Sequence, residues 1–198
     1  MSPPAFRYAT GRRVCRLLLR ALYSLEVRGA ARVPAAGPLV VVANHESVLD
    51  PFVLGCALER ELRFMAKAEL WRYRHVAWAM DRLRAIRVER GRGDREALDE
   101  ARRALVAGEA VAVFPQGAVR GGEVWLRGAA RLALVTGAPV IPVRLVGTAR
   151  ALSRGHVGLP KLVVLVGEPI AVERAAATVA AARELTERLR RAVETLGD

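Results

Sequence analysis

The sequence predicts an α/β protein: a single domain with a largely parallel mixed sheet flanked by helices, and an amphipathic helix at its N-terminus. Three observations support this fold class. Short apolar runs rich in valine recur along the chain, and segments of helical periodicity separate them. Strands joined by helical crossovers pair in parallel and are covered by helices. The 198 residues are 53% hydrophobic and 26% charged, which suits one folded domain with its own core.

The first expected element is a basic helix near the N-terminus. Its apolar residues recur at the spacing of one helix face, and its arginines fall on the other. The apolar set is Val14, Leu17, Leu18, Ala21, Leu22 and Leu25, and the basic set is Arg12, Arg13, Arg16 and Arg20. Such a helix either lies in a bilayer interface or packs on its own domain. We therefore divide the chain into a basic amphipathic helix (1–28) and a following domain (29–198).

The second part alternates strands and helices. Strands are expected at 37–44, 84–90, 110–115, 138–147 and 161–170. Helices are expected from about Ser47, over 94–108, over 129–137 and over 179–196. Asp94 is a candidate N-cap, and Gly108 is expected to end the same helix. No repeat or low-complexity block interrupts this alternation.

The charge balance favours an anionic partner. Lysine and arginine number 32 against 20 acids, a net charge of +12. Biased codon supply accounts for arginine over lysine, but not for the surplus itself. Nucleic acid, an anionic lipid surface and a phosphate-bearing substrate all fit this charge. Cys15 and Cys56 are isolated, so the sequence indicates neither a zinc site nor a disulfide framework.

Residues 40–51, VVVANHESVLDP, place side chains that can act in catalysis at the end of an expected strand. Asn44 and His45 close a buried strand, and Asp50 follows the histidine by five residues. A neutral imidazole can take a proton from an alcohol when a carboxylate fixes its tautomer and stabilises the imidazolium. The alternative is structural: a histidine at a helix N-terminus, with Asp50 in the first turn.

Other loops are expected at the same edge of the sheet. Ligands collect at the carboxyl ends of parallel strands. Arg90 ends one expected strand, and residues 115–120 follow another, so both loops are expected to converge near His45.

Several common sites are absent from the sequence. There is no GxSxG elbow, no GxxxxGK[ST] loop and no GxGxxG after a strand. His75 and His156 have no partners at metal-ligand spacing, so no metal is expected. A base without a protein nucleophile implies that the substrate supplies the attacking hydroxyl.

The motif NHESVLD resembles the NHxxxxD box of the glycerolipid acyltransferase family, whose bacterial members include 1-acylglycerol-3-phosphate acyltransferase. Further blocks of that family have counterparts in the same order. They are FMAKAEL (64–70), RAIRVER (84–90), FPQGAVR (114–120) and WLRGAARLALVTGAPVIPV (125–143). The resemblance covers residues from about 28 to 170.

This resemblance implies transfer of a fatty acyl group from acyl-CoA or acyl carrier protein to the hydroxyl of a lysophospholipid, above all 1-acylglycerol-3-phosphate. His45 would be the general base and Asp50 its orienting partner. The acceptor and its phosphate would be bound by Lys67, Arg90, Gln116, Gly117 and Arg120. No cofactor would be needed, and the enzyme would be peripheral, on the cytoplasmic face of the membrane.

The motifs depart from the family at named positions. Arg84 stands where the second box usually opens with glycine. Gln116 stands where glutamate is usual, and Ala118 and Val119 stand where threonine and arginine are usual. Arg120 follows one position later. These changes leave the proton chemistry of His45 intact and concern the recognition of the acceptor.

Three alternatives stay open. The first is an acyltransferase for another lysolipid or hydroxylated lipid. The second is a family member that has lost catalysis and docks on lipid. The third is a nucleic-acid-binding domain, although no recognition motif or clustered aromatic residues support nucleic acid as a partner. Lys67 is one of two lysines among 32 basic residues, which marks either a need for a compact ammonium group or chance.

Overall fold

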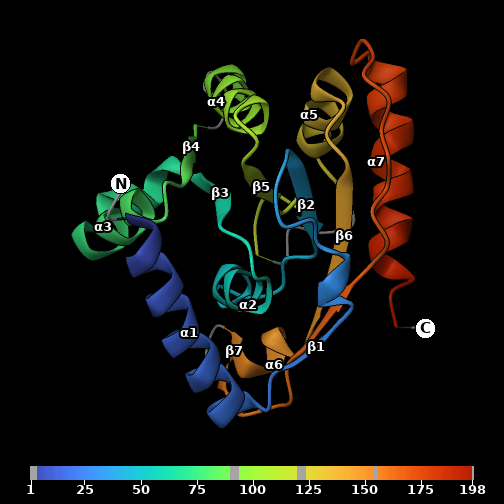
Figure 1. Cartoon of the computed structure of the whole chain (residues 1–198). Coiled ribbons are helices and arrows are strands. Elements are labelled where there is room, and N and C mark those ends of the chain that lie inside the picture. The colour runs from blue at the N-terminus through green and yellow to red at the C-terminus, as the bar shows by residue number, and fades with distance from the viewer. Residues whose placement is uncertain (1–3, 90–93, 120–123, 154–155, 198) are drawn as a thin grey trace.

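The computed structural model describes residues 4–89, 94–119, 124–153 and 156–197, and within them a seven-stranded sheet lies between two layers of helices (Figure 1). The strand order is β1-β9-β6-β2-β5-β3-β4. The strands are β1 (Glu26–Arg28), β2 (Leu39–Ala43), β3 (Leu62–Lys67), β4 (Ile86–Val88), β5 (Ala110–Val113), β6 (Val140–Val146) and β9 (Val163–Val166). The β6–β9 pair is antiparallel and the other pairs are parallel, which confirms the predicted mixed sheet.

Helices cover both faces of the sheet. They are α1 (Pro4–Tyr23), α2 (Asp50–Ala57), α3 (Arg74–Arg82), α4 (Asp94–Val106), α5 (Gly128–Thr136), α6 (Thr148–Ala151) and α7 (Val179–Glu194). Short 3-10 helices, η1 (Ala30–Arg32) and η2 (Ala68–Arg72), and a small hairpin, β7 (Leu152–Ser153) with β8 (His156–Val157), complete the described elements.

The core has two halves because side chains of a strand alternate between faces. Leu39, Val41 and Ala43 of β2 pack in the half that includes α2. Val40 and Val42 pack in the other half, which includes α4, α5 and α7. All five side chains of β2 are buried, as expected for a central strand covered on both sides.

Several element boundaries differ from the sequence-based expectation. Helix α2 begins at Asp50, because residues 47–49 form a turn in which the Asp50 N–H donates to Ser47 O at 3.1 Å. Helix α4 ends at Val106, followed by Gly108 at φ +78°, so the expected glycine stop is confirmed. The sequence reasoning gave no assignment to β1, β3, η1, η2, α3, α6 or the β7–β8 hairpin.

Helix α1 packs on the domain with a face that the sequence reasoning did not select. Leu19 is buried, and Cys15 and Tyr23 pack against the core that contains α2. Arg12 donates to Leu58 O at 2.7 Å, and Arg16 pairs with Glu59 at 3.2 Å. The carbonyls at the C-terminal end of a helix attract cations, so these arginines turn toward α2.

The predicted apolar face of α1 is therefore largely turned away from the domain. Val14, Leu17, Leu18 and Leu22 are each more than half exposed. Leu25 was wrongly placed on this face: α1 ends at Tyr23, Ser24 adopts φ +47°, and Leu25 is buried in the core. Helix α1 thus presents an outer surface of valine and leucine.

Candidate active site

Asn44 extends the sheet beyond the end of β2. Its side-chain Nδ2 donates to Leu145 O at 2.9 Å, and its Oδ1 accepts from Leu145 N at 2.7 Å. The amide of an asparagine has the same donor and acceptor as a peptide group, so this pair continues the contact between β2 and β6. Asn44 thereby fixes the point at which the chain leaves the sheet and His45 begins the loop.

His45 and Asp50 form a dyad in this loop. His45 Nδ1 lies 2.9 Å from Asp50 Oδ2. The same carboxylate oxygen accepts from the backbone N–H groups of Glu46 at 2.6 Å and Ser47 at 2.8 Å. Asp50 is fully buried in the first turn of α2, where the helix dipole stabilises negative charge. The loop therefore wraps around the carboxylate that orients the imidazole.

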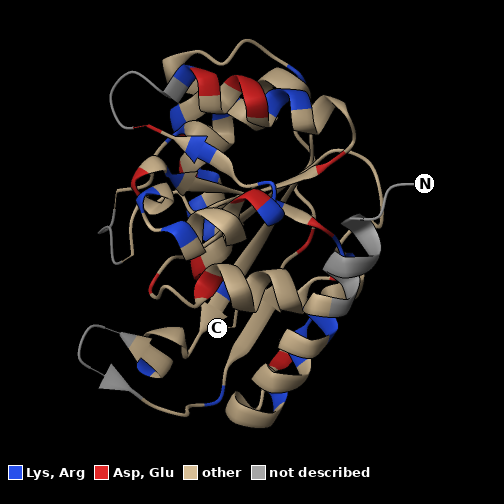
Figure 2. Cartoon of the chain, turned by 90° about the vertical axis from the view of Figure 1, so that its left-hand side faces the viewer, with Lys and Arg blue, Asp and Glu red and all other residues tan. Residues whose placement is uncertain are grey.

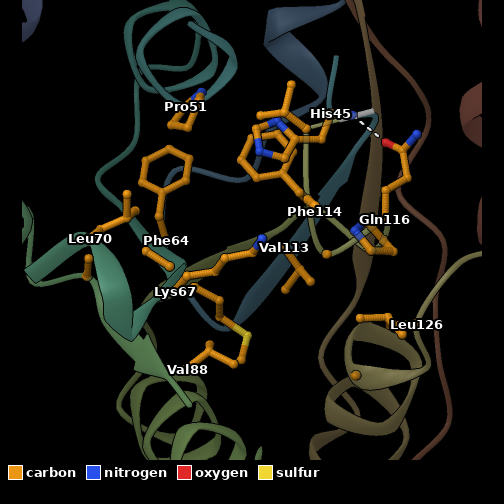
Figure 3. Close-up of a pocket in the computed structure, with 18 of the residues that line it drawn as sticks. His45, Pro51, Phe64, Lys67, Leu70, Val88, Val113, Phe114, Gln116 and Leu126 are labelled. Atoms are coloured by element: carbon orange, nitrogen blue, oxygen red, sulfur yellow. Dashed lines mark hydrogen bonds between the residues drawn. The ribbon is translucent and has the colours of Figure 1, made fainter. Parts of the chain in front are cut away.

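The loop after β5 holds His45 from the other side. Val42 of β2 is paired with Val113 of β5. Three residues further along the chain from each of them, beyond the ends of both strands, His45 and Gln116 lie opposite each other. Gln116 Oε1 accepts from the His45 backbone N–H at 2.5 Å (Figure 3). Phe114 stacks on the imidazole with ring centroids 4.4 Å apart and planes at 23°. Gln116 thus fixes the backbone of His45, while the stacking of Phe114 and the bond from Nδ1 to Asp50 leave the imidazole ring little freedom to rotate.

The arrangement leaves one imidazole nitrogen for chemistry. Because a carboxylate can only accept, the hydrogen shared with Asp50 resides on Nδ1 and Nε2 has a free lone pair. His45 lines a cavity of about 1710 Å³, to which α1, α2, β3, α3 and α7 contribute side chains. The cavity exceeds the roughly 300–1,000 Å³ typical of small-molecule sites. The site can thus bring a long apolar substrate to a fixed base.

Cys15 of α1 and Cys56 of α2 lie on the wall of this cavity. A hydrogen bond from the Cys56 thiol lowers the pKa of Cys15 to about 7. The same bond, together with burial, raises the pKa of Cys56. Among the described residues, no group of three or more His, Cys, Asp and Glu side chains is placed to bind a metal ion.

Of the other predicted site residues, three line the cavity and two lie outside the described residues. Lys67 ends β3 and extends across the cavity toward the end of β5 (Figure 3). Gly117 also lines the cavity at φ +68°, and its N–H donates to Phe114 O at 3.0 Å within the turn. Gln116 lines the cavity too, with its oxygen directed at the His45 amide. Arg90 and Arg120 lie outside the described residues, so their roles stay predictions.

A model of the acyltransferase family matches residues 24–146, which span the dyad and the strands that position it. The chain belongs to the acyltransferase family. The resemblance read from the ordered boxes is thereby confirmed.

Named acyltransferases show how far the similarity extends. A chloroplastic 1-acyl-sn-glycerol-3-phosphate acyltransferase of Brassica napus is 28% identical over 143 residues, which are 69% of this chain and 41% of that protein. The 1-acyl-sn-glycerol-3-phosphate acyltransferase of Bacillus subtilis is 28% identical over 154 residues, 74% of this chain and 76% of that protein. The chain thus spans about two fifths of the plant relative and most of the bacterial one.

A solved acyltransferase shares the fold. The 1-acyl-sn-glycerophosphate acyltransferase PlsC from Thermotoga maritima superimposes with a TM-score of 0.75 at 24% identity. The match covers 96% of this chain and 80% of that one. The single-domain α/β architecture predicted from the sequence is therefore confirmed.

Two contacts of this candidate site were missed by sequence reasoning. The stacking of Phe114 on His45 and the hydrogen bond from His45 to Gln116 both depend on the register between β2 and β5. Residue types alone carry no signal for that register. The anchoring role of Asn44 was accessible in part, since an asparagine after five apolar residues at a strand end is unusual for a buried sheet.

Proposed function

We propose that this acyltransferase-family protein moves a fatty acyl group from acyl-CoA or acyl carrier protein to the free hydroxyl of 1-acylglycerol-3-phosphate. The observation that carries the proposal is the His45–Asp50 pair, which opens onto a large, mainly apolar cavity. The base suits an alcohol, and the cavity suits an acyl chain. The names of the relatives favour the same acceptor.

In this mechanism His45 Nε2 takes the proton of the acceptor hydroxyl as its oxygen attacks the thioester carbonyl. Asp50 stabilises the imidazolium that forms. When the carbon–sulfur bond breaks, the departing thiolate takes the proton back from His45, so the base is regenerated. Neither a cofactor nor a covalent acyl-enzyme enters this sequence.

Lys67 is proposed as a ligand of the acceptor's phosphate. It lines the cavity beside the dyad, and its ammonium carries a compact positive charge. Arg90 and Arg120 are proposed as further phosphate ligands from their place in the boxes. We assign Gly117 to the turn that shapes this part of the cavity, because its φ of +68° favours glycine.

A second candidate acceptor is a lysolipid or hydroxylated lipid without phosphate. The observation that favours it is Gln116, whose oxygen is occupied by the His45 amide and which replaces the family's usual carboxylate. Both candidates use the same base and differ only in how the acceptor is held.

We further propose that the protein works at a membrane surface, on the cytoplasmic face of the membrane. Among the described residues, no helix is long and apolar enough to cross a bilayer. The outer face of α1, formed by Val14, Leu17, Leu18 and Leu22, can instead lie in the bilayer interface. Arg13 and Arg20 flank this face and are exposed, where they can meet anionic headgroups.

The decisive experiment is a turnover assay with acyl-CoA that offers 1-acylglycerol-3-phosphate together with a phosphate-free monoacylglycerol. We expect transfer mainly to the phosphate-bearing acceptor. His45→Ala is expected to lower turnover by roughly 100- to 10,000-fold with the fold intact. Asp50→Asn is expected to be slow as well, because an amide cannot stabilise an imidazolium.

Further variants test the role of the base separately from the recognition of the acceptor. Lys67→Ala is expected to raise KM for the phosphate-bearing acceptor and leave the other unchanged. A preference for monoacylglycerol would reject the phosphate assignment while preserving the base. Full activity of folded His45→Ala would reject the mechanism.

A further inference from the structure

The segment formed by η2 and α3 is unusual because none of its side chains is buried. Helices α2, α5 and α7, in contrast, each place several side chains in the core. Large side chains of η2–α3 are directed to solvent instead. Tyr73 is 66% exposed and Trp78 is 62% exposed, and neither lines the cavity. Core packing therefore does not account for the aromatic residues of this segment.

The inner side of η2–α3 forms part of the cavity that holds His45. Leu70, Val76, Met80 and Leu83 line that cavity together with Phe64 and Val88 of the sheet (Figure 3). The segment is thus a thin wall with an apolar inner side and an outer side that carries charged and aromatic residues. One side faces the proposed acyl-chain site, and the other is exposed.

The outer side has the composition of a membrane-interface element. Trp and Tyr favour the interface because one part of the ring system is apolar and the other can hydrogen-bond. Arg82, which also lines the cavity, stacks on Trp78, and Arg87 of β4 stacks on the half-buried Trp71, each with the guanidinium 4.7 Å from the ring centroid. Over residues 67–84 there are five Lys and Arg (67, 72, 74, 82, 84) and two acids (69, 81), a net charge of +3.

The segment lies on the same side of the molecule as α1. Figure 1 places α3 beyond the β3–β4 edge of the sheet, on the same side of the molecule as α1, and both helices line the cavity. In the view from that side, basic residues lie along both elements (Figure 2). Val48 and Phe52 line the same cavity and are about half exposed. Apolar and basic groups thus surround the cavity on the side that carries α1.

We propose that η2–α3 is a second lipid-contacting element, which seats Tyr73 and Trp78 in an anionic bilayer beside α1 and brings the cavity to the headgroup region. This proposal rests on a lipid acceptor, as in the proposed function. An acidic protein such as an acyl carrier protein would match the charge of the segment but gives no reason for exposed tryptophan and tyrosine. A bilayer accounts for both.

Tryptophan fluorescence tests the contact directly, since the chain has three tryptophans, at 71, 78 and 125. The full chain carrying Trp71→Phe and Trp125→Phe reports on Trp78 alone, and the matched chain carrying Trp71→Phe and Trp78→Phe reports on Trp125. Each is mixed with phosphatidylglycerol vesicles that contain brominated acyl chains. We expect a blue shift and strong quenching for Trp78 and neither for Trp125.

A functional readout uses Trp78→Ser with Tyr73→Ser, two residues that do not line the cavity. Turnover of 1-acylglycerol-3-phosphate presented in vesicles is expected to fall by about tenfold or more, since each ring contributes on the order of 1 kcal/mol or more when buried. Turnover of a water-soluble short-chain analogue is expected to stay unchanged. Circular dichroism checks that the variant is folded.

The outcomes separate this proposal from the proposed function. If the vesicles float the protein but Trp78 is neither shifted nor quenched, the second contact is rejected and α1 alone docks. If Trp78 responds to soluble acyl carrier protein and not to vesicles, the segment is a protein-binding site and the proposal is rejected. If Trp78 is quenched while acyl transfer is undetectable with every acceptor, the contact stands and the proposed activity fails.

Discussion

Three consecutive backbone amides, those of His45, Glu46 and Ser47, each donate to a side-chain oxygen. Gln116 receives the first, and Asp50 receives the other two. The Ser47 hydroxyl donates in turn to Leu152 O at 2.6 Å, which ties the loop to the β7–β8 hairpin. A loop of ordinary flexibility is thus held in one conformation at the point where the base must stay within reach of a substrate proton.

Gln116 is expected to act as a positioning residue through its hydrogen bond to the backbone of His45. Gln116→Ala leaves that partly buried N–H without its acceptor, a loss of roughly 1–3 kcal/mol. We expect a lower kcat with little change in KM for the acyl donor. Gln116→Glu keeps an oxygen in place and is expected to recover most of the rate. Steady-state kinetics of both variants decides the matter: an alanine variant with wild-type kcat would show that the bond is dispensable.

The cysteine pair gives a prediction about reactivity against pH. The pKa of Cys15 is lowered to about 7 by the Cys56 thiol, and the thiolate is the reactive form. Alkylation of Cys15 should therefore rise through about pH 7. In Cys56→Ala the donor is lost, so the midpoint should move up toward the ordinary value of about 8.5. Iodoacetamide labelling followed by mass spectrometry measures this, and an unchanged midpoint would contradict the hydrogen bond.

At the scale of elements, periodicity predicts those segments whose burial is one-sided or complete. Strands β2, β5, β6 and β9 and helices α4 and α7 were all expected, because apolar side chains mark their buried faces. The α3 segment has an apolar stripe of Val76, Met80 and Leu83, but this stripe lines the cavity and no residue of α3 is buried in the core, and the sequence reasoning did not assign the helix. For α1 the pattern gave two faces but not which one meets the domain, since that depends on the carbonyls at the end of α2.

The candidate site, like the fold, could be predicted from the sequence only in part. The His45–Asp50 pair was predictable because five residues within one loop limit how far apart the side chains can lie. The contacts of His45 with Phe114 and Gln116, which follow β5, were not predictable, because they depend on which strands become neighbours in the sheet. The spacing of residues within one loop can be read directly from the sequence, whereas the order of strands in the sheet results from the packing of the whole chain.

Arg84 precedes β4 with φ +50°, a left-handed conformation that favours glycine. It occupies the position where the family's second box usually opens with glycine. Its guanidinium pairs with Glu109 at 2.7 Å, an exposed contact that contributes roughly 0–1 kcal/mol. Both Arg84→Gly and Arg84→Ala remove this ion pair, but only glycine also relieves the backbone strain.

We therefore expect Arg84→Gly to be more stable than Arg84→Ala by about 1 kcal/mol. The control is Arg102 within α4, where glycine is expected to be less stable than alanine by a similar amount. Urea unfolding of the four variants measures the free energies. The same order of glycine and alanine at both positions would refute the explanation.

At the scale of the whole molecule, the fold places its reactive and its apolar surfaces together. The dyad follows the end of β2, and the cavity that it lines receives side chains from both α1 and α3. Helices α1 and α3 lie on the same side of the molecule (Figure 1), and α1 exposes Val14, Leu17, Leu18 and Leu22. The inward arginines Arg12 and Arg16 hold α1 in this orientation through α2. A surface that would be a liability in solution is thereby consistent with a lipid-bound enzyme.

The outer face of α1 should then determine how strongly the whole protein binds a bilayer. Leu17 and Leu18 are 65% and 56% exposed, so Leu17→Asn with Leu18→Asn removes apolar surface without disturbing the core. Burial of a leucine contributes about 1.5–3 kcal/mol, so we expect vesicle affinity to fall by at least tenfold. The control is Val106→Asn on α4, which changes an apolar residue that is 73% exposed and lies away from α1. Flotation with phosphatidylglycerol vesicles measures both, and equal losses in the two variants would mean that α1 has no special part in binding.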